Sequence, residues 1–136
     1  MNKDEKARHD DQVECAFLEA VARRLPMDDE VLRPLAEAYT RLGDYGSGLG
    51  VDRQLARLCP EDPLVWYNLA CSHALLGAVD EAVAALGRAV EIGYDDYDWM
   101  KQDRHLDPLR DDPRFQSLLE WVYAYGDDEE ESYEEF

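Results

Sequence analysis

The sequence is poor in lysine, in cysteine and in long apolar runs. Only three of its 14 basic residues are Lys, and they stand against 32 carboxylates, so that the formal net charge is −18. A protein this acidic repels nucleic acid, because binding to the phosphate backbone depends on Lys and Arg that displace counterions. Anionic membrane surfaces are disfavoured for the same reason. The partners to expect are therefore neutral or basic proteins or peptides.

The cysteines and the opening residues bear on the compartment. Cys15, Cys59 and Cys71 are odd in number and widely separated, which does not suggest the disulfide framework of a secreted domain. Residues 1–8 are charged and contain no apolar signal core, and no later apolar run is long enough to span a membrane. We therefore expect a cytoplasmic protein that makes no membrane contact.

What the sequence does contain is an internal repeat. Apolar residues make up 46% of the 136 residues, enough for the core of one domain. Several landmark residues recur 34 positions later along the chain: Leu32 and Trp66, Leu35 and Leu69, Ala36 and Ala70, Gly43 and Gly77, Pro26 and Pro60. A fixed period of this length is typical of stacked helical hairpins.

The period and pattern resemble the tetratricopeptide repeat (TPR) family, whose signature is W-x2-L-G-x2-Y, then A-x3-F, then a closing Pro. The repeat over 63–96 supplies Trp66, Leu69, Ala70, Gly77, Ala82, Leu86 and Ala89, and the repeat over 29–62 supplies Leu35, Ala36, Tyr39, Gly43, Gly48 and Pro60. Three positions depart from the pattern: His73 replaces a Tyr, Tyr94 replaces the Pro, and Asp52 replaces a packing aromatic. The resemblance is strong over 29–96.

The resemblance implies an all-α fold in which antiparallel helix pairs form a short superhelical array with capping helices at both ends. Within a helical domain at 10–125 we expect helices near 10–25, 30–42, 47–58, 63–76, 80–92 and 113–125. Residues 97–125 form a closing segment that resembles the Asp-Pro-rich end of many bacterial arrays, with Tyr97 and Trp99 tucked under its last helix. Residues 1–9 and the acidic tail 126–136 are expected to be disordered.

Both capping helices have an expected apolar face. In the first, apolar residues at helical spacing mark the face that should pack: Val13, Ala16, Phe17, Ala20, Val21 and Leu25. In the last, Asp112 is the expected N-cap and Pro113 the first helical residue. Its apolar face is Leu118, Leu119, Val122 and Tyr125.

No motif predicts catalysis, a metal or a cofactor. The glycines of 46–50 follow no strand and precede no Lys, so they do not form a phosphate-binding loop. Cys71 and His73 stand two residues apart on a helix, where side chains diverge, so they cannot share a metal without partners from elsewhere. The acidic stretch at 95–98 lacks the Gly and Glu of a calcium loop.

The function we expect is protein binding without catalysis. In arrays that this chain resembles, the first helix of each repeat lines a concave groove for a peptide or a partner helix. The corresponding candidates here are Arg33, Glu37, Arg41, Tyr67, Asn68, Cys71 and Leu75. Asn68 matches one residue of the family's carboxylate clamp, but Glu30 and Pro34 stand at its other places, so a clamp is not expected.

Three alternatives stay open. Tyr67 and Leu75 could pack against the closing segment instead of lining a groove. The chain could be a self-associating repeat, so that both a monomer and a weak homodimer are compatible with the sequence. An accessory subunit of an enzyme is the third, although no catalytic constellation supports it.

The first prediction concerns salt. Eleven Arg against three Lys, with 18 Asp and 14 Glu, suits a salt-rich cytoplasm in which ions screen self-repulsion, although a genome rich in G and C also favours Arg over Lys. We expect the melting temperature to rise substantially from dilute buffer to molar salt. A melting temperature that is indifferent to salt over this range would exclude the salt-adapted interpretation.

Overall fold

The computed structural model describes residues 1–126, and over this range the fold is all-α. It consists of seven α-helices and one 3₁₀ helix, with no strand among these residues. The expected acidic tail at 126–136 lies outside the described residues except for Gly126. The chain divides after Pro60 into two compact units.

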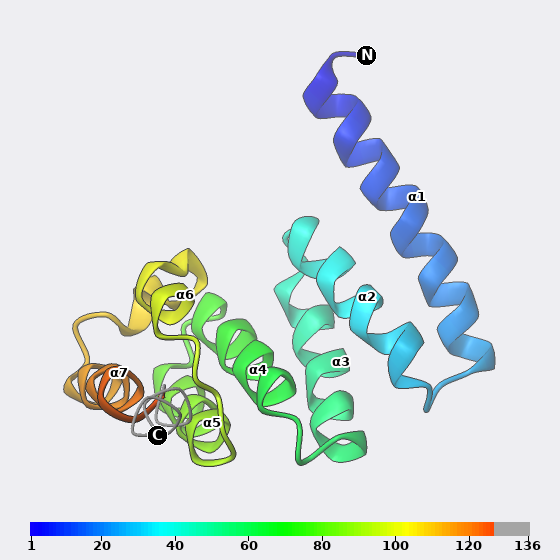
Figure 1. Ribbon diagram of the computed structural model, residues 1–136. Coiled ribbons are helices and arrows are strands. Elements are labelled where there is room, and N and C mark those ends of the chain that lie inside the picture. The colour runs from blue at the N-terminus through cyan, green and yellow to red at the C-terminus, as the bar shows by residue number, and fades with distance from the viewer. Residues whose placement is uncertain (127–136) are drawn as a thin grey trace, which may run out of the picture. The chain divides into compact units, whose positions relative to one another are not determined.

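The N-terminal unit contains three helices: α1 (Lys3–Arg24), α2 (Asp29–Arg41) and α3 (Tyr45–Leu58). Each helix runs back along its predecessor, with α2 packing against both α1 and α3, and α1 extends beyond the end of α2 (Figure 1). The core between α1 and α2 joins Cys15, Leu35 and Ala38. Because Cys15 and Ala38 have small side chains, the two helices can approach closely at this core.

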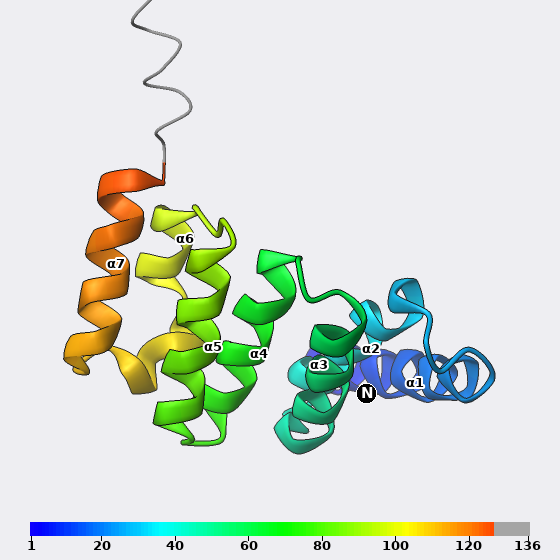
Figure 2. The ribbon, with the colours of Figure 1, turned by 90° about the horizontal axis from the view of Figure 1, so that it is seen from below.

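The C-terminal unit begins with the helical hairpin α4 (Pro63–Leu75) and α5 (Val79–Glu91). It continues through α6 (Tyr97–Gln102) and the 3₁₀ helix η1 (Arg104–Leu109) to α7 (Pro113–Tyr125). In Figure 2, α7 runs beside α5, whereas η1 packs against α4. All of the largest fully buried side chains of the described residues belong to this unit: Tyr67, Leu86, Met100, Leu106, Leu109 and Phe115.

The repeat period of the sequence reappears in the local structure of the two hairpins. Helices α2 and α4 begin one period apart and end one period apart, and α3 and α5 also begin one period apart. The N-caps Asp28 and Asp62 each accept a hydrogen bond from the backbone N–H two positions later, at 3.0 and 2.9 Å. Gly43 and Gly77 follow the first helix of each hairpin with φ of 77° and 78°. A left-handed residue at this place ends a helix, and glycine adopts it without steric cost.

Helix α1 starts earlier than expected. The disorder predicted for residues 1–9 is not found, since the helix begins at Lys3. The side chain of Asn2 caps it by accepting a hydrogen bond from the N–H of Glu5 at 2.8 Å. Asp4 and Glu5 also place negative charge in the first turn, where its interaction with the helix dipole stabilises the helix.

Helix α1 also packs through a different face from the one predicted. Cys15 is buried with Leu18 and Ala22 beside it, whereas Val13 and Phe17 remain 56% and 65% exposed. Polar contacts with α2 accompany this orientation of the helix. Arg41 binds Asp11 at 3.2 Å and Glu14 at 3.0 Å, and the hydroxyl of Tyr39 donates to Glu19 at 2.7 Å, all on the side of α1 that carries Cys15.

The closing segment follows the prediction in part. Asp112 caps α7 by accepting from the N–H of Arg114 at 2.9 Å, and the ring of Tyr97 lies under α7 with its centroid 4.9 Å from that of Tyr123. The side chains of Trp99 and Tyr125, however, are 51% and 53% exposed. Phe115 is the fully buried anchor of α7 that the predicted apolar face omitted.

The second prediction compares two glycines of the N-terminal unit. Gly50 lies within α3, and a Cβ atom built there would meet nothing within 4 Å. The Gly50→Ala variant should therefore be more stable by about 0.5–1 kcal/mol, because alanine loses less backbone entropy in a helix. Gly43→Ala should instead lose at least about 1 kcal/mol, because its φ of 77° is strained for any residue with a Cβ.

Urea unfolding measures both free energies. A gain at Gly43, or a loss at Gly50, would contradict the backbone conformations described for these two positions.

Candidate functional site

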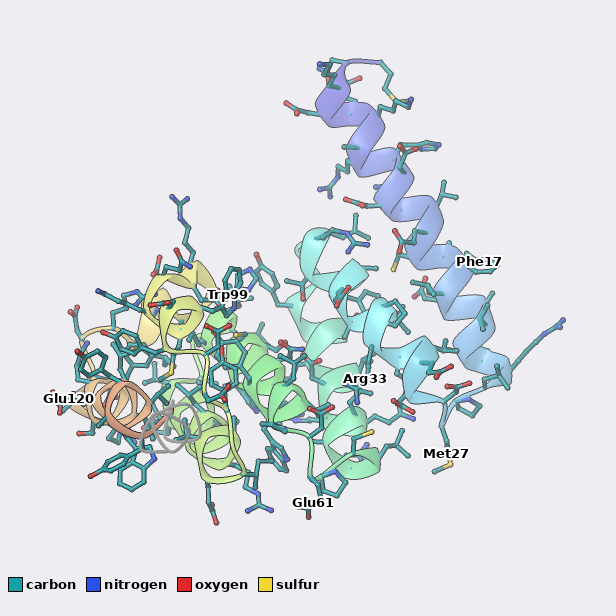
Figure 3. The ribbon with its side chains drawn as sticks, viewed as in Figure 1. Phe17, Met27, Arg33, Glu61, Trp99 and Glu120 are labelled. Atoms are coloured by element: carbon teal, nitrogen blue, oxygen red, sulfur yellow. The ribbon has the colours of Figure 1, made fainter. Side chains whose placement is uncertain are left out.

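The predicted groove residues of α2 serve in part to hold the N-terminal unit together. Arg33 forms an ion pair with Asp29 at 3.2 Å within the first turns of α2, and Figure 3 shows it on this helix. Arg41 binds two carboxylates of α1 and so anchors that helix. Glu37 is exposed.

The predicted groove residues of α4 divide into buried and accessible ones. Tyr67 is only 2% exposed and Cys71 is also buried, so neither can line a groove for a peptide. The alternative expected from the sequence, packing against the closing segment, is the one found for Tyr67. Asn68 is exposed and Leu75 half-buried. Of the seven candidates, three thus stand on α2 in one unit and four on α4 in the other.

Tyr67 and Cys71 instead belong to a polar cluster beneath η1, which we call the Asp103 cluster: Tyr67, Cys71, Asp103 and His105. The hydroxyl of Tyr67 donates to Oδ2 of Asp103 at 2.6 Å, and the Sγ atom of Cys71 lies 3.8 Å from the same oxygen. Oδ1 of Asp103 accepts from the N–H of His105 at 3.0 Å and lies 3.7 Å from Nδ1 of its ring. Asp103 is 6% exposed, and the His105 side chain is 49% exposed.

The backbone around Asp103 explains how the carboxylate comes to lie there. Asp103 ends α6 and caps η1, and its carbonyl oxygen accepts from Nη2 of Arg110 at 2.7 Å. Arg110 is itself held by Asp107 at 2.8 Å. The turn is thereby fixed on both sides, and the carboxylate points at α4.

The aromatic surroundings keep the Tyr67 hydroxyl a donor. The rings of Tyr67 and Tyr94 stack with centroids 4.3 Å apart and planes 7° apart. Burial is the largest cause that raises the pKa of Tyr67 above its ordinary value, and the hydrogen bond to Asp103 raises it further. The phenol therefore stays protonated and donates to the carboxylate.

Sequence reasoning missed Asp103 and His105, because the partners of Asp103 on α4 stand far earlier in the chain. The one local signal is the N-cap position of Asp103, which predicts a helical turn but not a contact with α4. The sequence pairs Cys71 only with His73 and leaves a metal site short of partners from elsewhere. The structure brings Asp103 and His105 close to Cys71.

A second candidate surface is the apolar face of α1, defined by Val13, Ala16, Phe17 and Ala20. All four side chains are exposed. Figure 3 shows Phe17 on the side of α1 that turns away from α2. α7 also exposes aromatic residues, with the rings of Trp121 and Tyr125 4.4 Å apart.

Comparisons with known protein families and with curated proteins found no match. None of the helices within residues 1–126 combines the length and the apolar character that crossing a bilayer requires.

The third prediction tests the central hydrogen bond of the Asp103 cluster. Tyr67→Phe keeps the stacked ring but removes the donor, and it leaves a buried carboxylate short of one partner. We expect the free energy of unfolding to fall by about 1–3 kcal/mol. Tyr123→Phe is the matched control, because that tyrosine is exposed and should change stability by less than about 0.5 kcal/mol. Equal losses in the two variants would show that the hydrogen bond contributes nothing measurable.

Proposed function

We propose that this chain is a short tetratricopeptide-type module that binds a helical segment of another protein and performs no catalysis. Two features support the repeat assignment: the regular period of the sequence, and the matching caps and glycines of the two hairpins. Repeat arrays of this class act as scaffolds for partners, so protein binding is the function to expect of one.

The observation that carries the proposal is the exposed apolar face of α1. Its four residues recur at the spacing of one helix face, the arrangement by which amphipathic helices bind each other. Phe17 lies at the centre of this face and is 65% exposed. Aromatic anchors of this kind dominate the energy of protein interfaces. The proposal therefore moves the binding site from the groove residues Tyr67 and Cys71, which are buried, to α1.

Charge indicates which partner fits. Two copies of a chain with a net charge of −18 repel each other, so self-association through α1 would be opposed at low salt. A basic amphipathic helix would instead be attracted over long range, which would speed its association, and a neutral helix would meet no such repulsion. We accordingly favour a different protein over the homodimer, and we place the interaction in the cytoplasm without a cofactor.

The fourth prediction concerns Phe17. The chain is used to capture partners from its source organism, and a partner so identified is purified and titrated against the wild-type chain and two variants. Phe17→Ala should weaken binding at least about tenfold, because it removes the central anchor. It should leave stability almost unchanged, because the side chain is largely exposed.

Tyr123→Ala is the control, since it removes an exposed aromatic from α7 instead. Binding that survives Phe17→Ala but is lost in Tyr123→Ala would place the site on α7. Sedimentation of the wild type at micromolar concentration separates the homodimer: a dimer that Phe17→Ala dissociates would make a second copy the occupant of this face.

A further inference from the structure

The Asp103 cluster brings together three side chains of the kinds that bind transition metals. The Sγ atom of Cys71, a carboxylate oxygen of Asp103 and a ring nitrogen of His105 all lie within 4.8 Å of one another. Cys71 comes from α4, whereas Asp103 and His105 come from the turn that starts η1. The three donors thus converge from two elements that are separate in the sequence.

Two of the three donor separations are close to those of a tetrahedral zinc site. Typical Zn–S and Zn–N or Zn–O lengths imply separations of about 3.6 Å between S and O and about 3.4 Å between N and O. The observed separations are 3.8 Å from Sγ of Cys71 to Oδ2 of Asp103, and 3.7 Å from Nδ1 of His105 to Oδ1. These two contacts use different oxygens of one carboxylate. All three donors therefore reach bonding positions if the exposed His105 ring shifts toward Oδ2, or if both oxygens bind the ion.

The surroundings of Asp103 resemble the outer shell of a metal site. Oδ2 accepts from the hydroxyl of Tyr67 and Oδ1 from the N–H of His105, so the carboxylate is oriented by hydrogen bonds from two elements. Carboxylate ligands held in this way keep lone pairs for an ion, and such partners set ligand orientation. The exposed His105 ring leaves an entry route from solvent, although Cys71 and Asp103 are buried.

We propose that Cys71, Asp103 and His105 form a three-ligand site for Zn²⁺, with the fourth position left to water. A thiolate with an imidazole selects zinc and similar ions over Mg²⁺ and Ca²⁺, which require oxygen ligands throughout. Binding replaces the proton of the Cys71 thiol by the ion, and that proton is released to the buffer. The bound ion ties η1 to α4 and stabilises the C-terminal unit.

Cobalt is the probe that reports the thiolate directly. The full chain, freed of metal with a chelator, is titrated with Co²⁺, and a thiolate-to-cobalt charge-transfer absorption is expected that Zn²⁺ then abolishes by displacement. Zn²⁺ should also raise the melting temperature of the wild type. His105→Gln should weaken Co²⁺ binding at least tenfold, and because His105 is exposed this variant should still fold. Cys71→Ser should remove the charge-transfer absorption entirely.

Matched controls separate this site from other binding. Cys59→Ser and His9→Gln change a cysteine and a histidine of the N-terminal unit, and both variants should behave as the wild type. The proposal is wrong if the wild type gives no charge-transfer absorption, because the cluster then serves only as hydrogen-bonded packing. It is equally wrong if the absorption survives in Cys71→Ser, or if His105→Gln binds Co²⁺ and gains stability from Zn²⁺ as the wild type does. Those results would assign the ion to another cysteine or to the acidic surface.

Discussion

The hydrogen bond between Tyr67 and the buried carboxylate of Asp103 is the contact on which the C-terminal unit depends. It joins Tyr67 of α4 to Asp103, the residue that caps η1, although the two residues are 36 positions apart in the sequence. A buried carboxylate is costly unless its oxygens are satisfied, and here both oxygens accept hydrogen bonds. The same contact therefore sets where η1 lies, and η1 brings the buried Leu106 and Leu109 into the core.

In each unit, further elements cover the apolar surface of a helical hairpin, but these elements differ between the two units. A two-helix hairpin cannot cover its own apolar surface, so something must pack against it. In the N-terminal unit α1 covers α2 through Cys15 and is held there by Arg41. In the C-terminal unit η1 packs on α4 and α7 on α5, with Phe115 fully buried. The N-terminal solution combines a small apolar core with ion pairs between helices, whereas the C-terminal one buries large side chains.

The sequence predicted the features that depend on local chemistry. The start of α7 was predicted from the Asp112 cap and Pro113, and the helix limits near 30–42 and 63–76 agree with α2 and α4, which the left-handed Gly43 and Gly77 follow. It could not predict the rotation of α1 or the partners of Asp103. Val13 and Phe17 are more apolar than Cys15, yet Cys15 faces α2, on the side of α1 where Arg41 forms its ion pairs. The contacts of Arg41 with α1 and of Asp103 with α4 join residues far apart along the chain, and such contacts produce no periodic pattern in the sequence.

The two proposals rest on separate parts of the chain, so each can stand without the other. The apolar face lies on α1 in the N-terminal unit, and the Asp103 cluster lies between α4 and η1 in the C-terminal unit. An ion in the cluster would stabilise its own unit. Partner binding that depended on zinc would require coupling between the units. Measuring partner affinity with and without Zn²⁺ distinguishes a structural ion from a regulatory one.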